Sequence, residues 1–347
     1  MKVLQFSRYA NNSKNNGFTN RSTGFGNMVF DISYSIASIE KISVDLLTIN
    51  NFPKERNFKN LNFPKKNWRL IFSNFKLNYF LRAIHTIKED KPPLRMVPRY
   101  FFYFISLGFI KKILEENKYD LIHIHGIGPA TKPMIDLCET LNQKYLVTLH
   151  GLNSFSDSVN ASNKHKLYER NLLKKAFIED IPITVISTGI KNIITNFLNA
   201  KEATNLKVVT NGCDTTSLVN QEDFDIKKRY NINKDKKLAV CVGNIVKRKN
   251  QIQVVRAFSL LSEPVRSNLV ILFLGNDFTN GVFKSEIKKF ELENSLIICG
   301  NIPKDQVPFF YTQASFNIVA SISEGFGLSI IESFVYGVPT VTYSDLD

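Results

Sequence analysis

The alternation of apolar and polar segments predicts two consecutive sets of buried strands joined by helices. The first set begins with the apolar run Lys2–Phe6, followed by a polar, Asn-rich loop. A helix then reaches Ile39, with apolar positions three to four residues apart. Such alternation is typical of a parallel sheet covered by helices. Further strands of this set are expected at Ser43–Ile49, Asp120–Ile124, Lys144–Leu149, Ile183–Ser187 and Leu206–Thr210.

A second set of strands follows the polar stretch Asp214–Lys237, which should hold a connector and a charged helix. Because the strand pattern restarts after this stretch, we expect an α/β protein with two domains in tandem. Their predicted bounds are 1–213 and 237–347, with a connector at 214–236. The expected strands of the second domain are Leu238–Val242, Leu269–Leu274, Leu296–Cys299, Phe316–Ala320 and Val338–Tyr343.

Positive charge is concentrated between residues 54 and 112. The 347-residue chain has a formal net charge of +14, and this segment alone holds 14 Lys and Arg against 3 Asp and Glu, a net of +11. Its expected helices, Trp68–Ile87 and Phe101–Glu116, are rich in aromatic residues. Two interpretations stay open. The segment docks on an anionic membrane surface, or its aromatic side packs on the sheet while its basic side is solvated. No helix-turn-helix, zinc-finger or RNP pattern supports nucleic acid as a partner.

The remaining composition is that of an ordinary globular protein, with 44% hydrophobic and 22% charged residues. The longest apolar run, Phe101–Ile110, is well short of the roughly 20 residues that span a bilayer. The N-terminal apolar stretch is too short for a signal peptide. We therefore expect a cytoplasmic protein, with peripheral attachment to the inner face of the cell membrane as the further hypothesis. The cysteines lie far apart and are expected to be buried thiols: Cys138, Cys213, Cys241 and Cys299.

The most informative motif lies between Glu324 and Glu332, after an apolar strand and at the start of a helix. Its glycines allow close backbone approach to a ligand, and the free amides at a helix start bind anions. The two flanking carboxylates suit sugar or ribose hydroxyls, which donate hydrogen bonds. Together these groups fit a nucleotide sugar, whereas the simpler interpretation is a glycine turn with two solvated acids.

This segment, Glu-Gly-Phe-Gly-Leu-Ser-Ile-Ile-Glu, resembles the E-x7-E motif of family 4 glycosyltransferases, which are retaining enzymes of the GT-B fold. The resemblance covers nearly the whole chain and implies two Rossmann-like domains with a cleft between them. Other segments match the family in order: Gly24-Phe25-Gly26, His123-Ile124-His125, Thr148-Leu149-His150-Gly151, Ser187, Asn211-Gly212-Cys213-Asp214, Val242–Asn250 and Gly337–Val341.

The resemblance also implies roles for individual residues. Glu324 would contact donor sugar hydroxyls and Glu332 the ribose. Lys249 would neutralise the departing diphosphate, where charge builds as the glycosidic bond breaks, and His150 would lie near the sugar and the acceptor. A surface Lys and a buried strand-end His are the structural alternatives. Structural roles are favoured for His123 and His125. The remaining donor-binding residues would be Gly24, Gly26, Asn244, Phe326, Gly327 and Leu328.

Two departures from the family pattern stand out. Asn244 occupies the position where the family usually has Arg, so one cation for the leaving group is missing unless Lys247 or Arg248 replaces it. The chain also ends at Asp347, directly after the last expected strand, whereas family members usually continue with several helices. This implies a C-terminally truncated second domain.

The sequence thus predicts a retaining glycosyltransferase that moves a sugar from a nucleotide-sugar donor to a glycan or lipid-linked acceptor. Bacterial surface polysaccharide synthesis is the expected pathway. No cofactor and no metal site are expected, because no loop holds an Asp-x-Asp pair apart from Asp345-Leu346-Asp347 at the chain end. The alternatives are a sugar-nucleotide epimerase of the same fold and a catalytically dead nucleotide-sugar-binding remnant.

Overall fold

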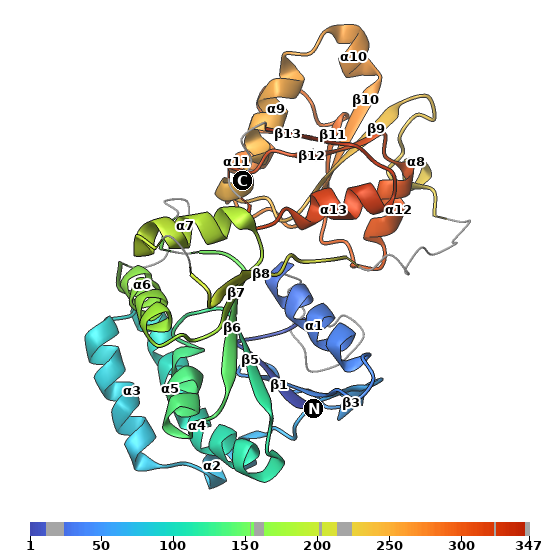
Figure 1. Cartoon of the computed structure of the whole chain (residues 1–347). Helices are drawn as coiled ribbons and strands as arrows, with labels where there is room; N and C mark the ends of the chain where they lie inside the picture. The colour runs from blue at the N-terminus through green and yellow to red at the C-terminus, as the bar shows by residue number, and fades with distance from the viewer. Residues whose placement is uncertain are drawn as a thin grey trace. The chain divides into compact units, whose positions relative to one another are not determined.

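The computed structural model describes residues 1–11, 24–152, 154–155, 163–200, 203–213, 224–322 and 324–343. The chain divides into two compact units, Met1–Thr210 and Asn211–Asp347 (Figure 1). Each unit contains its own sheet with its own hydrophobic core.

The first unit is built on an eight-stranded sheet of order β3-β4-β2-β1-β5-β6-β7-β8. Every neighbouring pair is parallel except β3–β4, which is an antiparallel hairpin. Parallel neighbours need crossover helices, which explains the alternation seen in the sequence. The strands are β1 (Lys2–Ser7), β2 (Ser43–Thr48), β3 (Asn57–Phe58), β4 (Leu61–Asn62), β5 (Leu121–His125), β6 (Tyr145–Leu149), β7 (Ile183–Val185) and β8 (Leu206–Val208).

Helices lie on both sides of this sheet, with α1 on one side and α4 and α5 on the other (Figure 1). Helix α1 buries Val29 and Phe30 against Val44 and Leu46 of β2. The helices of the first unit are α1 (Gly24–Ala37), α2 (Trp68–Ser73), α3 (Leu77–Asp90), α4 (Val97–Asn117), α5 (Lys132–Thr140), α6 (Asn163–Ile178) and α7 (Thr188–Leu198), with a 3-10 turn at Leu94–Met96.

The second unit contains a five-stranded parallel sheet of order β11-β10-β9-β12-β13. Buried apolar clusters on its two faces are centred on Phe273 and Phe310. The elements are α8 (Ile226–Arg229), β9 (Lys237–Val242), the 3-10 turn η2 (Lys247–Lys249), α9 (Gln251–Ser259), α10 (Glu263–Ser267), β10 (Leu269–Leu274), α11 (Val282–Lys289), β11 (Leu296–Gly300), α12 (Val307–Gln313), β12 (Phe316–Val319), α13 (Leu328–Val335) and β13 (Thr340–Thr342).

Both sheets confirm the predicted α/β class with two Rossmann-like sheets. The prediction of one continuous helix over Trp68–Ile87 is wrong, since α2 ends at Ser73 and α3 begins at Leu77. Asn74 ends α2, where its side-chain amide donates to the Leu70 carbonyl at 2.7 Å. Gly108 of α4 packs directly on this break. A Cβ at Gly108 would lie 1.9 Å from the carbonyl oxygen of Asn74.

Other differences from the sequence-based expectations are local. Helix α1 ends at Ala37, and Ile39 lies beyond it with 53% of its surface exposed. The hairpin β3–β4 was not predicted, because its strands are only two residues long. None of the cysteines forms a disulfide; Cys138 and Cys241 are buried, whereas Cys213 and Cys299 are half-buried. Among the residues that the structure describes, no helix is both long and apolar enough to cross a membrane.

Candidate functional site

Each sheet has one point where the strand order reverses. In the first unit this point lies between β1 and β5, and in the second between β9 and β12. Helices leave in opposite directions at such a point, and α/β sheets bind ligands there, beyond the carboxyl ends of the strands. The histidine cluster of the first unit and the glycine–acid motif of the second lie at these two places.

A row of polar residues crosses the first sheet close to the carboxyl ends of its strands. These residues are directly paired in register, so their side chains share one face of the sheet. Most of them are buried: Ser7, His125 and Thr148 are at most 6% exposed. Buried polar groups need hydrogen-bond partners, so such a row is costly unless it is connected. The row is Thr48, Ser7, His125, Thr148 and Thr184.

Three histidines form a connected group on this face. Nδ1 of His125 lies 3.0 Å from Nε2 of His150. The other nitrogen of His125, Nε2, lies 2.7 Å from Oε1 of Gln5. His123 forms a separate branch, since its Nε2 lies 2.6 Å from the hydroxyl of Thr148. His125 is buried, whereas His123 and His150 are half-buried. That His123 and His125 are weaker functional candidates than His150 stays a prediction.

Burial keeps all three rings uncharged at neutral pH. It lowers the pKa of His123 to about 3, with a further contribution from His150. Burial alone lowers the pKa of His150 to about 4. The pKa of His125 falls well below the usual range, through burial and then through the two neighbouring rings. A neutral imidazole has one donor and one acceptor nitrogen, so the group can orient hydroxyls.

The predicted glycine segment lies beside this histidine group. Gly24–Gly26 is the first turn of α1 and not a loop before it. Phe25 meets the ring of His150 edge to face, with 5.3 Å between ring centroids. Gly26 is required by close approach, because a Cβ there would lie 2.6 Å from the side chain of Asn11. The structure therefore places Phe25, between Gly24 and Gly26, against His150. Ser22 and Thr23, before this segment, lie outside the described residues.

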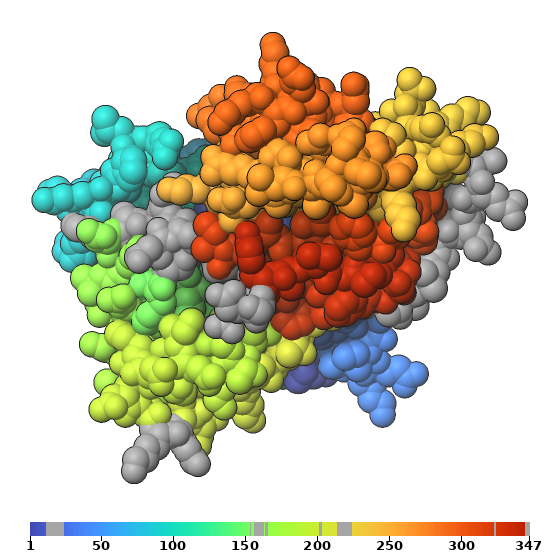
Figure 2. Space-filling view, turned by 90° about the horizontal axis from the view of Figure 1, so that it is seen from above, coloured from blue at the N-terminus to red at the C-terminus, as the bar shows by residue number. Residues whose placement is uncertain are grey.

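In the second unit two cations converge on Glu324. Nζ of Lys249 donates to the carboxylate at 2.6 Å, and the guanidinium of Arg248 at 3.3 Å. The hydroxyl of Ser321 donates to the same carboxylate at 2.5 Å. The Ile322 amide donates to the Arg248 carbonyl at 2.9 Å, so η2 is tied to the segment after β12. Figure 2 shows the surface around α9, in orange, adjoining that around α13, in red.

These contacts keep Glu324 ionised. Its side chain is only 11% exposed, and burial by itself raises the pKa of the carboxyl. The ammonium of Lys249, hydrogen bonds from Lys249 and Ser321, and the guanidinium of Arg248 outweigh burial and lower the pKa below 4.5. Arg248 is therefore a second cation on the carboxylate of Glu324, beside Lys249.

Asn244 shapes the loop after β9. Its side-chain oxygen accepts from the amide of Asn276 at 3.1 Å, which joins the loops after β9 and β10. The loops approach so closely that a Cβ at Gly275 would lie 2.4 Å from the carbonyl oxygen of Gly243. Gly243 itself has φ +130° and faces the side chain of Lys249. The structure thus assigns a positioning contact to Asn244.

Helix α13 presents its first amides at the carboxyl edge of this sheet. Gly327 precedes it with φ +68°, a left-handed conformation that favours glycine. The first N–H groups of a helix have no acceptor within their own helix, and with the helix dipole they favour an anion. The predicted backbone donors Phe326, Gly327 and Leu328 lie at this turn, whereas Ser323 of the motif lies outside the described residues.

Glu332 lies one turn into α13, beside a buried tyrosine. Burial, followed by the charge and a hydrogen bond of Glu332, raises the pKa of Tyr311 well above its usual value. The hydroxyl of Tyr311 also lies 3.2 Å from the Ser329 carbonyl. Sequence reasoning did not consider Tyr311 or Gln5, and it included Ser321 in the motif without giving it a role. For Gln5, an amide inside the otherwise apolar strand β1 was the available signal.

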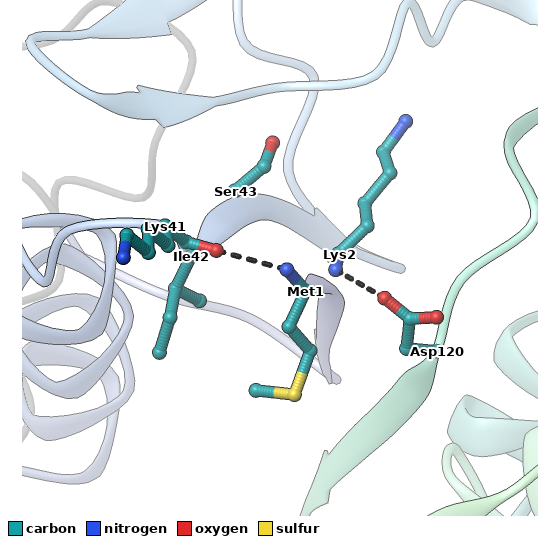
Figure 3. Close-up of a pocket in the computed structure, with 6 residues that line it drawn as sticks. All are labelled: Met1, Lys2, Lys41, Ile42, Ser43 and Asp120. Carbon is teal, nitrogen blue, oxygen red and sulfur yellow. Dashed lines mark hydrogen bonds between the residues drawn. The ribbon is translucent and has the colours of Figure 1, made fainter.

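A shallow pocket of about 550 Å³ lies at the opposite edge of the first sheet, lined by Met1, Lys2, Lys41, Ile42, Ser43 and Asp120. Figure 3 shows the Met1 amine donating to the Lys41 carbonyl and the Lys2 amide donating to Asp120. This is the edge at which β1, β2 and β5 begin, so these contacts hold the starts of the strands. Ligands of α/β sheets bind at the opposite edge, beyond the carboxyl ends of the strands. Across the described part of the chain, no cluster of three His, Cys, Asp or Glu could hold a metal ion. Asp214 and Asp345–Asp347 lie outside that part.

Comparison with known proteins gives the class that this fold and these sites define. Residues 59–217 match the family described as Glycosyltransferase Family 4. Residues 222–346 match the family described as Glycosyl transferases group 1. The two matches follow each other along the chain and together include most of both units. The chain belongs to the group 1, family 4 glycosyltransferases of the GT-B fold.

Three individual proteins illustrate the likeness. N-acetyl-alpha-D-glucosaminyl L-malate synthase of Bacillus anthracis is 22% identical over 276 residues, 77% of this chain and 68% of that protein. The putative teichuronic acid biosynthesis glycosyltransferase TuaC of Bacillus subtilis is 24% identical over 240 residues, 68% of this chain and 56% of that protein. The solved sucrose-phosphate synthase of Thermosynechococcus elongatus has a TM-score of 0.72 at 16% identity, and the match covers 99% of this chain and 81% of that one. The chain spans between about half and two thirds of the length of these curated relatives.

Proposed function

We propose that this protein is a retaining glycosyltransferase that moves a sugar from a nucleotide-sugar donor to a glycan or lipid-linked acceptor in bacterial surface polysaccharide or glycolipid synthesis. The observation that carries the proposal is the convergence of Lys249 and Arg248 on Glu324, beside the first amides of α13. Cations and helix-start amides suit a diphosphate, and carboxylates suit sugar hydroxyls.

On this proposal the second unit binds the donor. The diphosphate lies at the amides of Phe326–Leu328, the ribose at Glu332 and the sugar at Glu324. Lys249 turns from Glu324 to the diphosphate when the donor binds, and Arg248 stays with the carboxylate. Charge that builds on the departing diphosphate then meets Lys249 and the dipole of α13. The observed ion pair holds Lys249 at this place before the donor arrives.

The first unit binds the acceptor, with the histidine group at the carboxyl edge of its sheet. The basic aromatic segment 54–112 adds a candidate membrane surface. Trp68, Phe72 and Leu77 are at least half exposed, and they alternate with Arg69 and Lys76. Exposed aromatic side chains among cations are typical of segments that dock on anionic lipid. A peripheral position would place the enzyme beside a lipid-linked acceptor.

Binding of the donor is the first test. A ligand at about 100 times its dissociation constant adds roughly 2.7 kcal/mol to stability, a shift visible in thermal melting. We expect one series among UDP-, GDP- and ADP-sugars to stabilise the purified chain. Lys249→Ala and Glu332→Ala should abolish that shift. Lys247→Ala, an exposed lysine in the same turn, is the matched control and should preserve it. A panel in which no series stabilises the protein contradicts the proposal.

Turnover then separates the alternatives. A transferase releases nucleoside diphosphate only when acceptor is added, and the product keeps the anomeric configuration of the donor. An epimerase converts the donor without any acceptor. A catalytically dead protein binds donor and releases nothing. The matches to two glycosyltransferase families favour the transferase over these alternatives.

A further inference from the structure

One nitrogen of the histidine group has no partner. Within the described residues, Nδ1 of His150 is buried and forms no hydrogen bond. A buried polar atom without a partner costs roughly 1–3 kcal/mol, so an unexplained one at a ligand-binding edge calls for a partner that arrives later. Whether this nitrogen can accept or donate a hydrogen bond depends on the tautomer of His150. The neighbouring contacts determine that tautomer.

The contacts of Gln5 and His125 decide the tautomer in a chain. Oε1 of Gln5 faces His125 and can only accept, whereas Nε2 of Gln5 is buried without a partner among the described residues. In this orientation of the amide, His125 donates to Oε1 from Nε2. A neutral His125 then has a bare Nδ1, which accepts from Nε2–H of His150. His150 is neutral as well, so its Nδ1 is the bare nitrogen. Within the described residues, the two contacts together leave the buried Nδ1 of His150 as an acceptor without a partner.

From this relay we propose that Gln5 and His125 are positioning residues that hold His150 in the Nε2–H tautomer, so that its bare Nδ1 accepts a hydrogen bond from a sugar hydroxyl of the substrate. This inference deepens the proposed function and rests on it for the identity of the hydroxyl. The relay itself is a property of the ligand-free first unit.

The position of the relay fits this role. Gln5 and His125 are 0% and 1% exposed, whereas His150 lies at the strand end and contacts Phe25. Their strands β1, β5 and β6 are adjacent in the sheet, so the relay runs from the core to the ligand-binding edge. A nitrogen with a pKa of about 4 is too weak a base to remove a hydroxyl proton at neutral pH. The acceptor therefore orients the hydroxyl and does not deprotonate it.

The test is the tautomer of His150 in the ligand-free full-length chain. Proton–nitrogen correlation spectra of the protein labelled with ¹⁵N-histidine distinguish a protonated from a bare ring nitrogen, and His150→Gln identifies the signal. We expect a bare Nδ1 on His150 in the wild-type protein. Gln5→Met removes the acceptor at similar size, and the His150 signals should then move toward a mixture of tautomers.

The matched control is Thr184→Val, which removes a hydroxyl from the same polar row. Thr184 contacts Thr148 and lies on the His123 branch, so the His150 tautomer should not change. A protonated Nδ1 on wild-type His150, or a Gln5→Met spectrum identical to the wild type, overturns the inference whether or not the protein is active.

A second readout uses substrate. Loss of the fixed acceptor should lower kcat/KM of Gln5→Met by about tenfold, the value of one neutral hydrogen bond. A deoxy-sugar donor or acceptor that lacks the oriented hydroxyl should be unaffected by Gln5→Met, whereas an equal loss on every substrate overturns the hydroxyl contact. If the tautomer is as proposed and no sugar is transferred, the relay stands and the proposed function fails.

Discussion

At the scale of single residues, burial decides what each candidate can do. Gln5, His125 and Thr148 are buried and hydrogen-bonded within the sheet, although Nε2 of Gln5 has no partner among the described residues, so they organise the site. His150 directly follows β6 and Lys249 lies in the turn η2 after β9, and both are only half-buried, so they are better placed to reach a ligand. Sequence reasoning placed Lys249 and Glu324 as separate ligands of the donor. It could not show that they pair in the absence of donor, because 75 residues separate them along the chain.

The neutral histidines predict a loss of stability in mild acid. Their folded pKa values lie below the unfolded value of about 6.5, so the unfolded chain binds more protons as pH falls. Stability is therefore complete above about pH 6.5 and declines below it, by roughly 1.4 kcal/mol per histidine for each pH unit. Urea unfolding at pH 7.5 and 5.5 measures this decline.

Substitution of single histidines tests the source of that decline. His150→Gln should reduce the pH dependence, because one buried ring is removed. His85→Gln, at a histidine whose side chain is 74% exposed, should not change it. Equal stability of the wild-type protein at pH 7.5 and 5.5 would show that these rings are charged in the folded state.

Glu324 also contributes stability that is lost in acid, but over a lower pH range than the histidines. Its folded pKa lies below the unfolded value, so its contribution to stability is present above about pH 4.5 and is lost as pH falls through the folded pKa. Glu324→Gln should cost about 2 kcal/mol at pH 7, since two cations lose their shared acceptor. Chemical denaturation followed by far-UV circular dichroism should show this difference shrinking in acid. Glu263→Gln, at an exposed ion pair, should change stability little.

At the scale of elements, the spacing of apolar residues and the residues that flank each apolar run predicted most strands and long helices. The strands stand out because parallel sheets bury continuous apolar runs. The break between α2 and α3 could not be predicted in this way. Aromatic residues continue at helical spacing through it. In the structure the Asn74 side chain donates to the Leu70 carbonyl at the end of α2, and Gly108 of α4 packs closely on Asn74. Likewise, Gly24 and Gly26 have helical backbones, so the turn of α1 differs from the glycine loop that their spacing indicated.

Gly108→Ala tests the packing at that break. The new methyl group would meet the carbonyl oxygen of Asn74, a backbone atom that cannot rotate away. We expect a loss of about 2–3 kcal/mol in the free energy of unfolding, as for other overpacked cores. Lys112→Ala on the same helix, at an exposed ion pair, is the control and should stay within about 0.5 kcal/mol. An unchanged urea midpoint for Gly108→Ala would show that α2 shifts freely on α4.

The exposed side chains of α2 and α3, which include Trp68, Phe72 and Leu77, are expected to bind anionic vesicles. Part of the positive charge of segment 54–112 cannot contact lipid, because Lys66 is buried and donates to the carbonyls of Thr48 and Asn51. Co-sedimentation should show binding to phosphatidylglycerol vesicles, weaker binding at high salt, and little binding to phosphatidylcholine. Substitution of both Trp68 and Phe72 by Ser should reduce it, whereas Leu260→Ser, at an exposed leucine of the second unit, should not. Equal, negligible sedimentation with both lipids would rule out this surface.

At the scale of the whole molecule, the two units have separate cores. Most of the predicted donor-binding residues lie in the second unit, whereas Gly24 and Gly26 lie in the first. The chain has one tryptophan, Trp68, and it lies in the first unit, stacked on Phe52 with centroids 5.2 Å apart. Trp68 fluorescence therefore reports unfolding of the first unit, and far-UV circular dichroism reports both.

This arrangement predicts how a nucleoside diphosphate, the leaving group without its sugar, changes unfolding. If it binds the second unit alone, saturating diphosphate should move part of the circular dichroism transition to higher urea and leave the Trp68 transition in place, since a ligand stabilises only the unit that binds it. Glu332→Ala should remove the shift. Two probes that move together by the same amount would show that the units unfold as one, and that the diphosphate stabilises the first unit as much as the second.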